Sequence, residues 1–186
     1  MTQMQLIQHI TGFDKHIKVD KLRSKLQEQS FSLRELVDLT FYPDKAVAQK
    51  ASRLLQTMLL KFPESYKDDI GYFVEHVADA DCANCKKHFA KIIVHLTSPD
   101  VSKEVRMEVK TINFETVVDL CFKWMNDAKM LTRMRASAAE ALFNLRHRYP
   151  WIAEALSKQL EMILPTATPM LAARGNYILS FLHPED

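Results

Sequence analysis

Apolar side chains recur along most of this chain at the spacing of amphipathic helices. In the segment DKAVAQKASRLLQTMLLKFP they fall within one arc of a helix that has about 3.6 residues per turn. Asp44 precedes the run as a candidate N-cap, and Pro63 ends it. The apolar positions of this predicted helix are Val47, Ala51, Leu54, Leu55, Met58 and Phe62.

The same pattern returns later, in the segment RMRASAAEALFNLRHRYP. Pro150 ends this second run as Pro63 ends the first. Its apolar positions are Met134, Ala138, Ala141, Leu142, Leu145 and Tyr149. Further helix starts are predicted by the capping box from Ser32 to Glu35, by Asn113 before FETVVDLCFKWM and by Asp127 before AKMLTRM.

The predicted helices fall into pairs. Each pair has a first apolar helix, a short turn with Asp or Pro, a second helix with small residues early, and a closing proline. The pairs span residues 36–63, 73–99, 117–150 and 160–184, and the last matches the pattern least well. Residues 98–113 are predicted as an inserted short helix or a loop. Residues 1–29 are predicted as one or two capping helices, with Gly12 as a break.

A repeat of about 37 to 50 residues is typical of helical solenoids, in which neighbouring pairs stack into a continuous core. Over residues 32–182 the chain resembles HEAT and armadillo repeat proteins. The resemblance implies an all-α, right-handed α-α superhelix of about four helical pairs with an N-terminal cap. We therefore expect a single helical-repeat domain over residues 1–186, with the cap at 1–31 and the repeats at 32–186.

The C-terminal half carries a second resemblance. The order VVDLCFKWM, RASAAEALFNL, YPWIAEALSKQLEMILP and AARGNYILSFL is similar to a family of short bacterial proteins without established function, some of which are labelled adenylosuccinate lyase. The adenylosuccinate lyases themselves are much longer than these short proteins, and they use a mobile Ser-Ser-x-Met-Pro-x-Lys loop. This chain has no Ser-Ser pair, and Met170 follows Pro169. Since the residues do not support the label, we expect no enzyme activity.

The composition of the chain argues against several classes of function. The 186 residues carry a formal net charge of +2, which implies no strong polyelectrolyte partner by charge alone. Only three glycines occur, and neither glycine-rich phosphate-loop motif is present, which argues against nucleotide binding through such a loop. The chain has no signal peptide pattern and no apolar run of about 18 residues. We expect a cytoplasmic protein that does not associate with membranes.

The stretch DADCANCKKHFAKIIVH is the best candidate for chemistry. Zinc needs four ligands and one C-x-x-C supplies two, while a redox C-x-x-C needs a βαβ context. If Asp81 caps a helix that begins at Cys82, both thiols lie on the apolar face. The shared face would consist of Cys82, Cys85, Phe89, Ile92, Ile93 and Leu96. We favour thiols packed in the core over a metal or redox site, and expect no metal and no cofactor.

Basic residues form the second candidate, because the second helix of each pair is rich in Lys and Arg. They could form one binding surface, with cations and stacking rings added by RHRYPW. Its candidate residues are Lys50, Arg53, Lys87, Lys91, Arg135, Arg146 and Trp151. A third candidate is a peptide groove lined by Trp124, Trp151, Phe122, Phe143, Met125 and Met130, which we interpret mainly as core. Trp151 is the one we expect to be partly exposed.

These patterns predict a non-enzymatic helical-repeat scaffold that binds a protein partner. The alternative is a nucleic-acid-binding HEAT-like protein that uses the basic surface, in which case affinity would fall steeply with salt. HEAT-like DNA glycosylases and repair proteins use such surfaces. The identity of the partner and the oligomeric state do not follow from the sequence.

Overall fold

The structure, a computed structural model, describes residues 3–12 and 32–183, and within them the regular elements are all helical. The all-α prediction is confirmed. The α-helices are α1 (Gln3–Gly12), α3 (Leu33–Leu39), α4 (Lys45–Lys61), α5 (Ile70–His76), α6 (Ala83–Thr97), α7 (Lys103–Thr111), α8 (Glu115–Asn126), α9 (Thr132–Leu145), α10 (Trp151–Ile163) and α11 (Pro169–Leu182). Short 3₁₀ segments occupy Pro63–Asp69, Val77–Asp79 and Leu164–Thr166.

Contacts divide the chain into two compact units, Met1–Phe89 and Ala90–Asp186. The expected single domain stays a prediction. Most of the predicted N-terminal cap, residues 1–31, lies outside the described residues. The part of the cap that the structure describes is α1, which ends at Gly12.

Helix starts in the first unit follow the predicted caps. The Asp44 carboxylate accepts hydrogen bonds from the backbone N–H groups of Ala46 and Val47, at 2.8 and 3.4 Å. Ser32 and Glu35 form the predicted capping box, since each side chain bonds the other residue's backbone N–H. These bonds satisfy N–H groups that have no partner within the helix, which explains why α3 and α4 begin where the sequence indicates.

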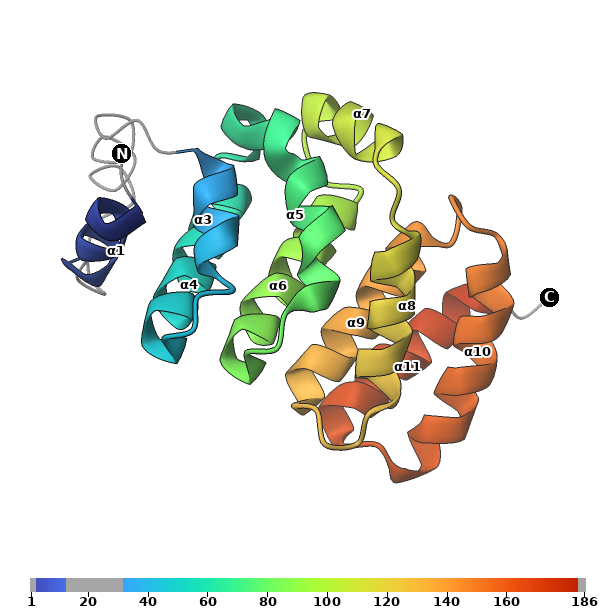
Figure 1. Ribbon diagram of the computed structural model, residues 1–186. Helices are drawn as coiled ribbons and strands as arrows, with labels where there is room; N and C mark the ends of the chain where they lie inside the picture. Colours follow the sequence, from blue (N-terminus) through green and yellow to red (C-terminus); the bar gives the residue numbers. More distant parts are fainter. Residues whose placement is uncertain (1–2, 13–31, 184–186) are drawn as a thin grey trace. The chain divides into compact units, whose positions relative to one another are not determined.

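The first unit is held together by apolar faces that meet between helices. In α4 the predicted face is buried at Val47, Ala51, Leu54, Leu55 and Met58. Helix α3 packs against α4 and α5 (Figure 1). Phe73 of α5 meets Phe89 of α6 edge to face, with ring centroids 5.6 Å apart.

Two polar contacts tie the ends of α3 to the segment around α5. The Arg34 guanidinium donates to the Asp69 carboxylate at 2.7 Å, and this bond raises the pKa of Arg34. The Tyr72 hydroxyl donates to Asp38 at 2.7 Å, and this bond raises the pKa of Tyr72. Both pairs are exposed, so the buried apolar faces supply most of the stability.

In the second unit, α9 lies between α8 and α11 (Figure 1). Its small residues allow this close packing: Ala136, Ala138, Ala139 and Ala141 are all buried. Helix α10 packs against α9 and α11. A Cβ on the buried Gly175 of α11 would lie only 2.7 Å from the Cδ2 of Leu164, so glycine suits this crossing.

Three predicted helix starts are wrong by one or more residues. Helix α8 begins at Glu115 with Phe114 as its N-cap, although the Asn113 side chain still accepts from the Glu115 N–H at 2.9 Å. Asp127 instead ends α8, and α9 begins only at Thr132. Helix α6 begins at Ala83, so Cys82 stands before it. Local capping preferences cannot decide between adjacent positions when the preceding chain also has to turn.

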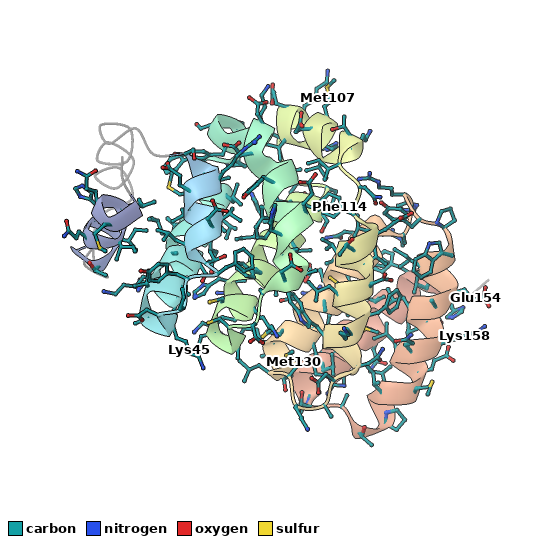
Figure 2. All side chains as sticks on the ribbon, viewed as in Figure 1. Lys45, Met107, Phe114, Met130, Glu154 and Lys158 are labelled. Atoms are coloured by element: carbon teal, nitrogen blue, oxygen red, sulfur yellow. The ribbon has the colours of Figure 1, made fainter. Side chains whose placement is uncertain are left out.

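The inserted segment between the second and third predicted pairs is a helix, α7, rather than a loop. Ser102 caps it, and Val105 and Val109 turn inward. Met107 projects from its outer side and is 61% exposed, whereas Phe114 lies inward at the start of α8 (Figure 2). Helix α7 is thus anchored along a narrow apolar edge.

Candidate binding surfaces

An open groove of about 510 Å³ runs between α9 and α11. From α9 it is lined by Arg133, Ala136, Ser137 and Glu140, and from α11 by Met170, Ala173, Arg174 and Tyr177. Arg174 lies 3.5 Å from the Glu140 carboxylate and 5.6 Å from the centroid of the Tyr177 ring. With two arginines and one glutamate, its lining carries a net positive charge.

An apolar row on α11 begins in this groove, where Met170 and Tyr177 line it, and continues one turn further to Phe181. Met170, Tyr177 and Phe181 share one helical face and are 53%, 52% and 56% exposed. The Tyr177 and Phe181 rings lie 5.0 Å apart, and Phe181 lies 5.9 Å from Phe143 of α9. Exposed large apolar side chains gathered in this way are typical of a contact surface. We call this row the α11 face.

A second hollow, of about 580 Å³, lies between the end of α6, α7 and the end of α9. Four cationic residues line it, namely Arg106, Lys110, Arg146 and Arg148, together with His147. No Asp or Glu is among its lining residues. We call this hollow the basic pocket. The sequence analysis predicted Arg146 and the segment RHRYPW as part of a binding surface. It did not predict that α7 lies next to them.

The arginines of the basic pocket are held by backbone carbonyl groups. Arg106 donates to the carbonyls of Pro99 and Val101, at 2.7 and 3.0 Å. Arg148 donates to Val109 at 2.8 Å and also to the carbonyl of Ile112. Carbonyl partners fix the position of a guanidinium without neutralising its charge.

Arg146 is placed by two contacts with the same residue. Its guanidinium donates to the Phe143 carbonyl at 2.6 Å and lies 3.7 Å from the centroid of the Phe143 ring. Partial burial lowers the pKa of Arg146, although a guanidinium stays charged in a protein. Arg146 is therefore a half-buried, oriented cation.

The other residues of the predicted basic surface are divided between the two units. The Lys50 amino group donates to the Thr11 carbonyl at 3.1 Å, while Arg53 is exposed on the same helix. Lys87 is half-buried and Lys91 is exposed, one turn apart on α6. Arg135 is half-buried and donates to the Met125 carbonyl at 2.8 Å. Their membership of one common surface stays a prediction.

The residues of the candidate peptide groove are core only in part, although the sequence analysis interpreted them mainly as core. Trp124 and Met125 are buried in the core, while Phe122, Phe143 and Met130 are half-buried. Trp151 is 52% exposed and stacks on Phe122 with a centroid separation of 5.8 Å. The expectation that Trp151 is partly exposed is confirmed.

The cysteine stretch is only partly as predicted. Cys85 is buried on the same face as Phe89, Ile92, Ile93 and Leu96, but Cys82 is half-exposed because it stands before α6. Burial, followed by a hydrogen bond with Cys82, raises the pKa of Cys85 to about 12. Burial alone raises the pKa of Cys121 to about 12. The described residues contain no group of three His, Cys, Asp or Glu side chains placed to hold a metal ion.

These environments predict selective alkylation of the native protein. At about pH 8 iodoacetamide should modify Cys82, and should reach Cys85 and Cys121 only after unfolding, because both are buried and protonated. Intact-mass and peptide mass spectrometry with and without denaturant measure the difference. Rapid modification of Cys85 in the native protein would contradict the packing of α6.

Raised thiol pKa values also give the sign of a pH effect. Above the pKa of an unfolded thiol, about 8.5, the unfolded chain loses these protons while the folded chain keeps them. Stability is therefore lost as pH rises from about 8.5 towards 12.

Among the described helices, none combines the length and apolar content needed to cross a membrane.

The sequence analysis did not predict the α11 face, although Met170, Tyr177 and Phe181 have helical spacing. No family model, no curated protein and no solved structure matches the chain, so its family is not assigned.

Proposed function

We propose that this chain is a non-enzymatic helical-repeat scaffold, a right-handed solenoid of the HEAT/armadillo kind, that binds a protein partner. The partner would place an acidic amphipathic segment along the groove between α9 and α11. The observation that carries this proposal is the exposed α11 face at a groove with net positive charge.

The chemistry of the groove argues for an amphipathic segment. Met170, Tyr177 and Phe181 offer apolar and aromatic area, which is the kind of surface that supplies binding hot spots. Arg133 is exposed at the groove and would attract a carboxylate of the partner. An apolar helix face with acidic residues at its margin would match both features.

Site-specific photo-crosslinking tests this proposal. With p-benzoylphenylalanine in place of Tyr177, we expect irradiation of the source cells to link the chain to one specific protein. The same label in place of Met162 is the control, since Met162 is apolar, 78% exposed and located on α10 outside the groove.

A second variant tests the charge. In the chain that carries the crosslinker at position 177, Arg133→Glu should weaken binding of the identified partner about tenfold. The substitution replaces attraction between Arg133 and an acidic partner by repulsion between two carboxylates. Purified partner and isothermal titration calorimetry measure this change. Equal crosslinking from both positions, or none from Tyr177, would contradict the proposal.

One observation supports the alternative function, binding of nucleic acid. Lys87 and Lys91 lie one turn apart on α6, and neither pairs with a carboxylate in a described ion pair. The exposed apolar row on α11 has no role in phosphate binding. For this reason we place the protein-binding scaffold first.

A further inference from the structure

We propose that the basic pocket between α6, α7 and α9 binds a nucleoside phosphate. This would be a small-molecule site in addition to the groove between α9 and α11, and it would work without a glycine-rich loop. The proposal depends on three features of the pocket: an uncompensated charge, oriented donors, and a size and lining that suit a ring together with a phosphate.

The charge of the basic pocket exceeds what the helix ends require. Arg and Lys side chains commonly cap the last carbonyls of helices, and α6, α7 and α9 all end here. Each helix end carries roughly half a negative charge, or about one and a half charges for three ends. Arg106, Lys110, Arg146 and Arg148 bring four positive charges, so an anion would be attracted to the hollow.

The donors are already oriented before a ligand arrives. Carbonyl groups hold Arg106, Arg146 and Arg148, yet each guanidinium has five N–H donors and the described bonds use only some of them. A phosphate could accept the remaining ones without any large loss of side-chain entropy. Lys110 is exposed, lines the same hollow and adds a fourth cation.

The size and the remaining lining favour a ring together with the phosphate. A volume of about 580 Å³ lies within the usual range for organic ligands and is more than a phosphate ion needs. Leu96, Val109 and Phe143 offer apolar area for a planar ring. Asn144 and Thr97, which hydrogen-bond to each other at 3.3 Å, offer polar groups that could read the edge of a base.

Isothermal titration calorimetry with ADP tests the site on the full chain. We expect saturable binding of ADP, with adenosine and inorganic phosphate each at least about tenfold weaker because each supplies only half of the contacts. Binding should weaken with added salt. No saturable binding of ADP, or adenosine binding as tightly as ADP, would overturn the proposal.

A matched pair of variants locates the binding. Lys110→Ala should weaken ADP binding about tenfold, and it should leave folding intact because Lys110 is exposed. Lys123→Ala is the control, with the same charge change at an exposed position on α8 outside the pocket. An equal loss in both variants, or no loss in Lys110→Ala, would overturn the assignment to this pocket.

Two further probes distinguish the source of the phosphate. A 5′-phosphorylated oligothymidine that binds more tightly than its 5′-hydroxyl form, with the same loss in Lys110→Ala, would support the site with the end of a nucleic-acid strand as its ligand. A phosphoserine peptide that binds more tightly than ADP would overturn the choice of a nucleoside phosphate.

Discussion

Replacing Phe73 with alanine is expected to lower the free energy of unfolding by about 3–5 kcal/mol. Phe73 is 1% exposed and meets Phe89 edge to face, so its removal leaves a cavity and deletes an aromatic pair between α5 and α6. Helix α5 contains only seven residues, too few for a stable isolated helix, so it stays folded because it packs against its neighbours. Urea denaturation followed by far-UV circular dichroism measures the effect.

Phe181→Ala is the matched control for this substitution. It removes the same atoms from a ring that is 56% exposed on the α11 face, and it should cost less than about 1 kcal/mol. If Phe73→Ala prevents folding, Phe73→Leu keeps most of the volume and should cost about 1 to 1.5 kcal/mol. A loss below about 1 kcal/mol for Phe73→Ala would contradict the packing of α5 on α6.

Arg148→Met is expected to destabilise the second unit by about 2–3 kcal/mol. The change keeps a long apolar side chain but removes the donors to the carbonyls of Val109 and Ile112 at the end of α7. Without Arg148 the Ile112 carbonyl loses this charged donor, and the Val109 carbonyl keeps only the bond from the Ile112 N–H at 3.3 Å. It also removes a cation that lies 5.5 Å from the centroid of the Phe114 ring.

Two measurements separate local from global effects of this variant. Urea denaturation followed by tryptophan fluorescence reports on the second unit, because Trp124 and Trp151 both belong to it. Hydrogen exchange should show faster exchange of the α7 amides. Arg133→Met, at an exposed position on α9, should change stability by no more than about 0.5 kcal/mol. Unchanged α7 exchange in Arg148→Met would show that the two hydrogen bonds do not anchor this helix.

Much of the local structure could be predicted from the sequence. Asp44 and the Ser32–Glu35 box set helix starts, because the bonds they make are to residues two or three positions away. The buried face of α4 follows from the spacing of its apolar residues. The helix starts near Cys82, Asn113 and Asp127 were misplaced because several adjacent residues can serve the same turn.

The candidate sites were harder to predict from the sequence. The basic residues were visible, but their partners were not: Arg135 bonds a carbonyl ten residues away in sequence, and Arg148 bonds one that is 39 residues away. The sequence indicated a charged surface. It could not indicate which arginines are held by carbonyls and which cations face solvent.

By itself, the sequence determined that this protein is helical, where several helices begin, and which sides of them are apolar. These properties depend on bonds and spacings within a few residues. Only the tertiary structure decided that α6, α7 and α9 end around one basic pocket, and that Met170, Tyr177 and Phe181 lie exposed at a groove. Both surfaces arise from packing between helices that are distant in the chain, and a local pattern carries no information about which ends will meet.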